Sequence, residues 1–114
     1  MSFYSTDPKD IKFARVNADA DGDNTVIVGI AGKKLRVLGY SLIASGAGLV
    51  TVKDDAGTPN VLAELQFAAG VLTASYPGGH SAPAFETAVG EGLVIGTQAG
   101  QDVNGHLTYL EVLA

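Results

Sequence analysis

This 114-residue chain contains no cysteine and no tryptophan, and no lysine or arginine follows Lys53. The lack of cysteine excludes a disulfide, a thiolate nucleophile and a cysteine-based metal site. No apolar run reaches the length of about 18 residues that a membrane-spanning helix needs, so we expect no membrane segment. The start, MSFYSTDPKD, lacks the basic-then-apolar pattern of a signal peptide, and we therefore expect a protein made in the cytoplasm.

Charge is distributed unevenly along the chain. All seven Lys and Arg residues occur up to Lys53, and the formal net charge is −5. From Asp54 onward, the chain has acidic residues but no lysine or arginine. Direct nucleic-acid binding requires clustered positive charge that displaces counterions, so we expect none. An acidic surface with a separate basic patch suits docking onto a complementary protein surface, and it is equally consistent with a solvated surface that has no specific role.

Short apolar segments separated by turn residues dominate the sequence. The 15 glycines follow no collagen-like period, which is typical of turns and bulges. The segment 61–67 also tolerates a helical interpretation, but Gly70 and the preceding Thr-Pro-Asn turn favour a strand. We expect strands over residues 11–18, 25–30, 35–44, 49–54, 61–67, 71–76, 85–88, 93–97 and 106–112.

About eight strands at roughly ten-residue spacing predict an all-β chain with a single-domain antiparallel β-sandwich, jelly-roll-like in topology. The sandwich is expected over residues 11–114, preceded by an extended N-terminal arm over residues 1–10. The arm lacks strand periodicity, so we expect it to serve docking or inter-subunit contact more than folding.

Alternation predicts which side chains share a face of each strand. Gly39 interrupts the apolar segment 35–44 and indicates a bulge that changes its inward face. We expect Ile11 and Phe13 to share one side, as should Val26, Val28 and Ile30, while Val50, Val52, Val61, Ala63, Leu65 and Phe67 point inward.

Two strands, 35–44 and the last one, are apolar on both faces. A sandwich core takes up one face of a strand, so the second face predicts contact with a partner. The candidate interaction residues on these strands and on the arm are Phe3, Tyr4, Leu38, Tyr40, Leu42 and Tyr109.

One run of acidic residues resembles a calcium loop. It spans residues 19–24, with carboxylates at alternate positions that could converge on a hard cation. The two positions that an EF-hand fills with Gly and a bidentate Glu hold Asn24 and Ile30 here. A polar turn explains the run without metal, and His80 and His106 are too few for a zinc site without cysteine.

No pattern for catalysis is complete. The sequence Gly46-Ala47-Gly48 leads into a strand instead of a helix, so the dinucleotide fingerprint fails. No serine lies in a nucleophile-elbow motif, and Glu86 and Glu91 lack a tryptophan platform for a sugar substrate. We therefore expect no catalytic residues, no cofactor and no enzymatic activity.

Three stretches carry a resemblance to a known group: GKKLRVLGYSLIASGAGLVTVKD, FETAVGEGLVI and VNGHLTYLEV. They resemble the small structural proteins encoded in the head-gene region of tailed phages, the capsid decoration (cement) proteins. The resemblance covers about Ala14 to Val112. It implies a β-sandwich oligomer of the virion that binds the outside of the assembled shell, contacts the major capsid protein and braces neighbouring capsomers.

A homotrimer is favoured over a dimer, because a shell offers threefold and quasi-threefold positions where three copies bridge three capsomers. The alternative function is a tail- or fibre-associated binding module that recognises carbohydrate. Scarce aromatic residues disfavour it, since sugar rings usually stack on Trp or Tyr.

Overall fold

The computed structural model describes residues 11–69, 72–78 and 82–113. These residues form strands joined by turns and loops, and none of the described residues forms a helix that could cross a membrane. The strands are β1 (Lys12–Ala18), β2 (Gly22–Ile27), β3 (Lys33–Ala44), β4 (Gly48–Asp54), β5 (Val61–Phe67), β6 (Thr73–Tyr76), β7 (Phe85–Glu86), β8 (Leu93–Thr97) and β9 (Val103–Leu113).

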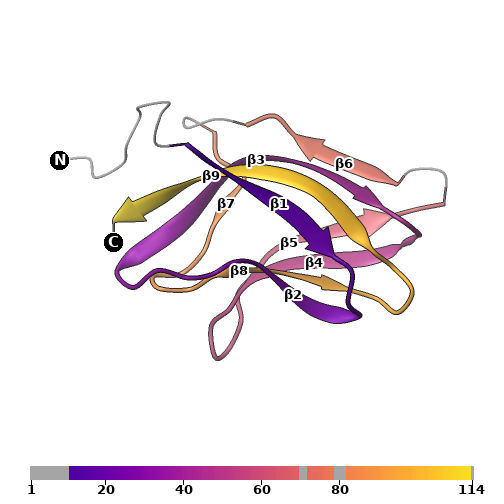
Figure 1. The fold of residues 1–114 in the computed structure, drawn as a ribbon, viewed down its shortest axis with the longest axis horizontal. Helices are drawn as coiled ribbons and strands as arrows, with labels where there is room; N and C mark the ends of the chain where they lie inside the picture. The colour runs from indigo at the N-terminus through magenta and orange to yellow at the C-terminus, as the bar shows by residue number, and fades with distance from the viewer. Residues whose placement is uncertain (1–10, 70–71, 79–81, 114) are drawn as a thin grey trace.

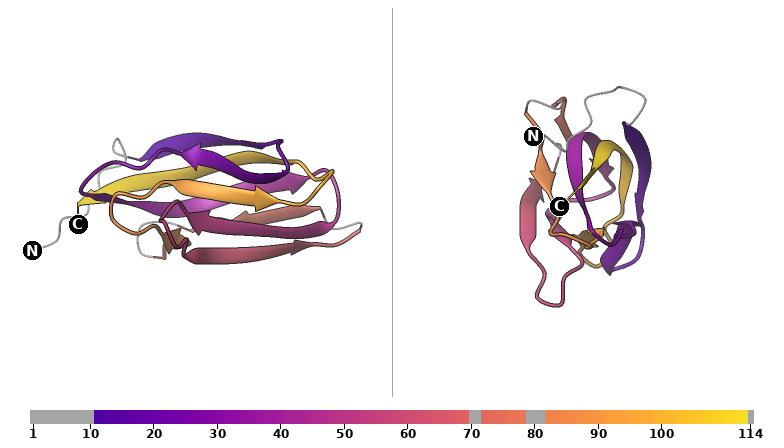
Figure 2. Two further views of the ribbon diagram at one scale, coloured as in Figure 1. Left: turned by 90° about the horizontal axis from the view of Figure 1, so that it is seen from below. Right: turned by 90° about the vertical axis from the view of Figure 1, so that its left-hand side faces the viewer.

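The strands form two antiparallel sheets that pack face to face (Figure 1). Sheet A has the order β1-β9-β3-β6, with β7 also paired to β3, and sheet B has the order β2-β8-β4-β5. Both layers run along the long axis of the molecule, as the two views in Figure 2 show. The predicted all-β sandwich is confirmed.

The pairing pattern is that of one long hairpin rolled into two layers. β4 pairs with β5, β3 with β6, β2 with β8 and β1 with β9, all antiparallel. Apart from the two-residue β7, these are eight strands whose pairs alternate between the two sheets, which is the arrangement of a jelly roll.

The two longest strands, β3 and β9, lie side by side in the middle of sheet A. Their pairing runs from Lys33 opposite Leu113 to Ala44 opposite Val103. The register shifts between Val37 and Gly39, so the bulge predicted at Gly39 is present. A Cβ on Gly39 would lie 2.7 Å from the Tyr76 carbonyl oxygen, which explains why glycine occupies this position.

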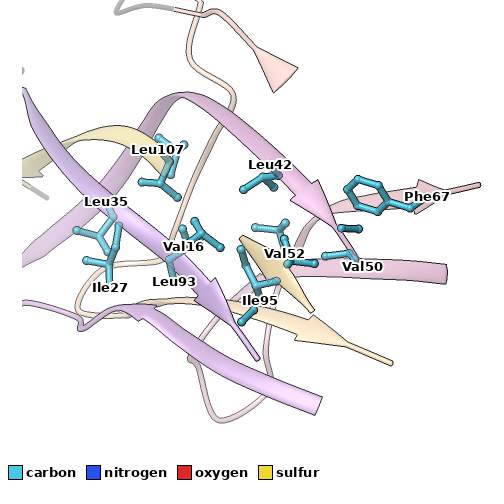
Figure 3. Packing of buried hydrophobic residues seen from close by; sticks show 14 residues of the cluster. Val16, Ile27, Leu35, Leu42, Val50, Val52, Phe67, Leu93, Ile95 and Leu107 are labelled. Atoms are coloured by element: carbon cyan, nitrogen blue, oxygen red, sulfur yellow. The ribbon is translucent and has the colours of Figure 1, made fainter. Parts of the chain in front are cut away.

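The bulge changes which positions of β3 face the core. Leu35 and Val37 point into the inter-sheet core before it, and Leu42 and Ala44 do so after it. The core fills the space between the sheets along their length, from Ile27 and Leu35 at one end to Phe67 at the other (Figure 3). Its buried members are Val16, Ala18, Ile27, Leu35, Val37, Leu42, Ala44, Val50, Val52, Phe67, Leu93, Ile95, Val103 and Leu107.

A second, smaller apolar cluster consists of Leu38, Leu110 and Val112, with Ile11 partly buried against them. The immediate neighbours of Leu110 and Leu38 along their strands, Tyr109 and Val37, belong to the inter-sheet core. Because side chains alternate along a strand, the second cluster lies on the opposite, outer face of sheet A. We call it the outer cluster.

Ile11 and Phe13 share one side of β1, as expected, and the buried side is the other one, where Val16 and Ala18 pack. Phe13 is 75% exposed. Other details of the strands differ from expectation. The second strand begins and ends earlier than predicted, at Gly22–Ile27, and a register shift after Thr25 turns Ile27 into the core while Val28 is exposed.

The fifth strand has the predicted bounds, Val61–Phe67. The strand interpretation of this segment is therefore confirmed, and the helical interpretation is wrong. Its first residue does not face inward. A register shift opposite Lys53 leaves Val61 exposed and packs Leu62 against the core instead.

Candidate functional surfaces

The predicted interaction residues do not form one exposed surface. Leu42 is buried in the inter-sheet core and Leu38 in the outer cluster, while Tyr40 and Tyr109 are partly buried against the core. The two-sided apolar character of β3 is therefore largely accommodated within the subunit, because Leu42 packs between the sheets and Leu38 packs in the outer cluster. Phe3 and Tyr4 lie outside the described residues.

Tyr40 stands between two other aromatic rings. Its ring centre lies 6.2 Å from that of Tyr76 and 6.0 Å from that of Phe85, both in stacked orientation. The Tyr76 hydroxyl donates a hydrogen bond to the Ala82 carbonyl oxygen at 2.9 Å. Burial, together with the neighbouring Tyr76, raises the pKa of Tyr40, so its hydroxyl stays protonated at neutral pH. The stack fixes β6 and β7 onto β3 and is structural in character.

Tyr109 occupies a similar position one strand away in sheet A. It packs against the inter-sheet core. Burial is the main cause that raises the pKa of Tyr109, and the nearby negative charge of Glu111 adds to it. A phenol held protonated in this way is a poor nucleophile or base at neutral pH. Neither phenol is therefore activated as a base at neutral pH.

The outer face of sheet A carries a shallow groove of about 300 Å³. The strand register places Ser41 opposite Ser75 on one side and opposite His106 on the other, and Arg15 follows beyond His106. These polar residues alternate with core residues along their strands, but their alignment in one row depends on the pairing of strands that lie far apart in the chain. The lining residues within the described part of the chain are Gly39, Tyr40, Ser41, Ser75, Tyr76, Pro77, Gly78, His106 and Thr108.

The outer face of sheet B has a hollow of about 450 Å³ over Gly96. Gly96 has no side chain to fill the hollow. Asp23 and Lys53 also line it, and the Lys53 ammonium lies 3.0 Å from an Asp23 carboxylate oxygen. Asp23 is largely exposed, so this ion pair contributes little to stability. The hollow and the groove both open widely to solvent and lack the enclosed geometry that excludes water from a reaction.

The acidic run 19–24 forms a turn in which Asn24 makes the central contacts. The Asn24 side chain accepts a hydrogen bond from the Ala20 N–H at 3.1 Å and donates to the carbonyl oxygens of Ala20 and Gly22 at 2.9 and 3.1 Å. Asp21 accepts a hydrogen bond from the Gly100 N–H at 3.2 Å. Within residues 11–69, 72–78 and 82–113, no three acidic or histidine side chains come together as a metal site.

Asp54 is a buried carboxylate that the sequence patterns did not single out. It is 1% exposed and accepts hydrogen bonds from Asn60, Ala88 and Ala56. Burial by itself would raise the pKa of Asp54, but these hydrogen bonds favour the ionised form and bring its pKa below the ordinary value. The Asp-Asp-Ala-Gly-Thr-Pro-Asn run is the signal that could have predicted such a loop.

Charged side chains gather differently at the two ends of the sandwich. At the end where β1 begins and β9 finishes, Glu111 lies 4.0 Å from the Lys12 ammonium and 3.6 Å from that of Lys33. Arg36 pairs with Glu86 at the same end. The loops at the opposite end carry acidic residues and, among the described residues 19–21, 45–47 and 98–102, no lysine or arginine.

The groove and the hollow are both shallow and lie on the outer faces of the two sheets. Comparison of the chain with family models, curated proteins and solved structures found no match.

Proposed function

We propose that this protein is a capsid decoration protein of a tailed phage, which binds the outside of the assembled shell through the major capsid protein and stabilises it. The protein would be a component of the virion, produced in the host cytoplasm. This role requires a rigid module with surfaces for self-association and docking, and it requires no active site.

The observation that carries the proposal is where the resemblance-bearing stretches lie in the fold. The first stretch, residues 32–54, builds β3 and β4, the second, 85–95, builds β7 and most of β8, and the third, 103–112, builds β9. Of these strands, β9 and β3 are the middle of sheet A and β8 and β4 are the middle of sheet B, while β7 pairs with β3. The three stretches thus form one packed unit instead of scattered surface matches.

Self-association is supported by apolar side chains on sheet edges. β1 is one edge of sheet A and β5 is one edge of sheet B. Phe13 on β1 and Val61 on β5 are both exposed, and an edge strand with an exposed apolar side chain is suited to a contact with a second copy. The proposed oligomer is a homotrimer, with a mass three times 11.6 kDa in solution.

A carbohydrate-binding module of the tail or fibre is the second candidate, and the groove on sheet A is the feature that favours it. Its serine, threonine and histidine side chains can hydrogen-bond to sugar hydroxyls. Its two aromatic residues are Tyr40 and Tyr76, which stack on each other, and the Tyr76 hydroxyl is also hydrogen-bonded. The groove therefore offers a sugar less aromatic surface than its lining suggests.

A shell-binding assay tests the proposal. Purified protein is mixed with shells assembled from the major capsid protein of the phage that encodes it, and the shells are pelleted. We expect saturable co-sedimentation and a higher disruption temperature of the decorated shells. Absence of binding to intact shells, combined with binding to host glycans, would favour the second candidate, and a Ser41→Trp variant that fills the groove should then abolish glycan binding.

A further inference from the structure

The outer face of sheet A carries a row of polar side chains that crosses four strands, which lie side by side (Figure 1). Arg15 of β1 lies opposite His106 of β9, which lies opposite Ser41 of β3. Ser41 in turn lies opposite Ser75 of β6. Arg15, His106 and Ser75 are exposed, and His106, Ser41 and Ser75 line the groove. The row is therefore accessible to a partner.

Basic side chains predominate on this face. Arg15, Lys34 and Arg36 each adjoin a residue of the inter-sheet core along their strand, so all three take outward positions. Among the described residues, the one carboxylate at an outward position of a sheet A strand is Glu86, which pairs with Arg36. Within the same part of the chain, Arg15 and Lys34 form no ion pair. The face therefore carries an excess of positive charge.

The other carboxylate on a strand of sheet A lies on the opposite side, as far as the chain is described. Glu111 stands between Leu110 and Val112 on β9, and both of these belong to the outer cluster. Because side chains alternate along a strand, the Glu111 carboxylate is on the inward side, where it lies near Lys12 and Lys33. It does not neutralise the outward face.

The outer face of sheet B has the opposite balance. Asp23 and Lys53 line its hollow and pair with each other. Glu64 of β5 is exposed and lies opposite Thr51, which also lines the hollow. The whole chain has a formal net charge of −5. The outer face of sheet A is thus a cationic surface on an acidic protein, and the two faces differ in the partner that they attract.

The chemistry of the polar row suits carboxylates. A carboxylate only accepts hydrogen bonds, and the row offers donors to it: the hydroxyls of Ser41 and Ser75, the ring N–H of His106 and the guanidinium of Arg15. Nucleic acid is a poorer match. Duplex DNA carries one negative charge per about 1.7 Å of its axis, whereas the cations of this face are few and scattered.

We propose that the outer face of sheet A is the surface that docks on the phage shell, and that the major capsid protein presents acidic side chains to it. The inference rests on the proposed decoration function and adds to it the docking face and the charge of the partner surface. Carboxylates of the capsid protein lie against Arg15 and enter the groove beside His106 and the two serines. Opposite charges orient the approach, and the outer face of sheet B points away from the shell.

Matched charge reversals on the two faces test the docking face. Arg15→Glu changes sheet A and Lys53→Glu changes sheet B, and both alter the net charge equally. Each variant is mixed with shells assembled from the major capsid protein, after circular dichroism has confirmed its fold. At low salt, Arg15→Glu should bind at least about tenfold more weakly than the natural protein, whereas Lys53→Glu should bind within about twofold of it.

The outcomes separate the docking face from the function. If the natural protein fails to sediment with shells, the decoration function is wrong and this inference fails with it. If the natural protein and both variants bind equally, the function stands and the docking face is wrong. Binding to double-stranded DNA that Arg15→Glu abolishes, without any effect of this change on shell binding, would identify a nucleic-acid surface and also overturn the proposal.

A thiol footprint tests the same face without reversing a charge. The chain has no cysteine, so an introduced one is its only thiol. Ser75→Cys reports on the outer face of sheet A, and Thr25→Cys reports on an exposed position of β2 in sheet B. The maleimide reaction is followed by the mass of this chain, so thiols of the capsid protein do not interfere.

Shell binding should protect one thiol and not the other. We expect Ser75→Cys to react at least about tenfold more slowly on shells than in free protein, and Thr25→Cys to react at a rate within about twofold of its free value. Because the free protein is the reference, contacts between copies in solution cancel. Protection of Thr25→Cys with Ser75→Cys unprotected would place the docking face on sheet B and overturn the proposal, as would equal reactivity of Ser75→Cys with and without shells.

Discussion

The carboxylate of Asp54 accepts two hydrogen bonds from Asn60, one from its backbone N–H at 2.9 Å and one from its side-chain amide at 2.8 Å. The two residues close the loop between β4 and β5. Asp54 also accepts hydrogen bonds from the backbone N–H groups of Ala56 at 3.3 Å and Ala88 at 3.2 Å. One buried carboxylate thereby ties the loop to the segment between β7 and β8.

Replacement of Asp54 by asparagine should destabilise the protein. The substitution removes a charged acceptor and turns an amide N–H group toward donors, so we expect a loss of about 2–3 kcal/mol in the free energy of unfolding. Urea denaturation of the variant measures it. The control is Asp55→Asn, which changes an exposed neighbour and should cost less than about 0.5 kcal/mol. Similar stability of both variants would contradict the role given to Asp54.

The same carboxylate predicts a pH dependence. Its pKa is lower in the folded protein than in the unfolded chain, so the unfolded state binds the proton first as the pH falls. The stabilisation is fully present above about pH 4, the ordinary value for an aspartate, and is lost as the pH falls through the lower folded-state pKa. Denaturation series from pH 7 to pH 2 should show a weaker acid dependence for Asp54→Asn than for the natural protein. Parallel curves would argue against the lowered pKa.

Gly105 on β9 should be irreplaceable. Its φ is +149°, and a Cβ there would lie 2.0 Å from the Ser41 carbonyl oxygen on β3. A Gly105→Ala variant must separate the two central strands of sheet A, and we expect a loss above about 3 kcal/mol or no folded protein. Gly57→Ala, where nothing lies within 4 Å, should fold normally. Thermal melts of the two variants distinguish them, and equal melting temperatures would contradict the close approach.

The buried side of β1 can be tested by paired substitutions. Val16 is fully buried in the inter-sheet core, so Val16→Asp would place an unpaired carboxylate there and should prevent folding. Phe13 is exposed on the opposite side, and Phe13→Asp should keep the far-ultraviolet circular dichroism of a β protein. If Phe13→Asp unfolded the chain while Val16→Asp did not, the strand would be turned the other way.

Local patterns predicted the strands that are buried on alternate positions. Val50 and Val52 face the core as their alternation requires, and the strand at 61–67 has the predicted bounds. The bulge at Gly39 was also predictable, because an apolar strand that continues on both sides of a glycine must change its inward face.

Alternation did not indicate which side of β1 is buried: the larger Phe13 lies outside, and the smaller Val16 and Ala18 pack in the core. The pattern failed where the register shifts. On β2 the register shift after Thr25 buries Ile27, which strict alternation does not anticipate. Local sequence does not record such shifts, because they depend on the partner strand.

Surfaces were harder to predict than strands. Leu38 and Leu42 were expected to need a partner, yet the bulge and the outer cluster bury both within the subunit. The groove at Ser41 and His106 depends on the pairing of β3 with β9, which lie far apart in the chain. That juxtaposition is a property of the rolled hairpin and not of any short segment.

The most direct test of the account is the location of this protein in the virion that encodes it. Cryo-electron microscopy of that virion, compared with one lacking the gene, should show added density on the outside of the shell at threefold or quasi-threefold positions, into which three copies of the jelly roll fit. Density confined to the tail or fibres, or virions that are identical with and without the gene, would contradict the proposed decoration function.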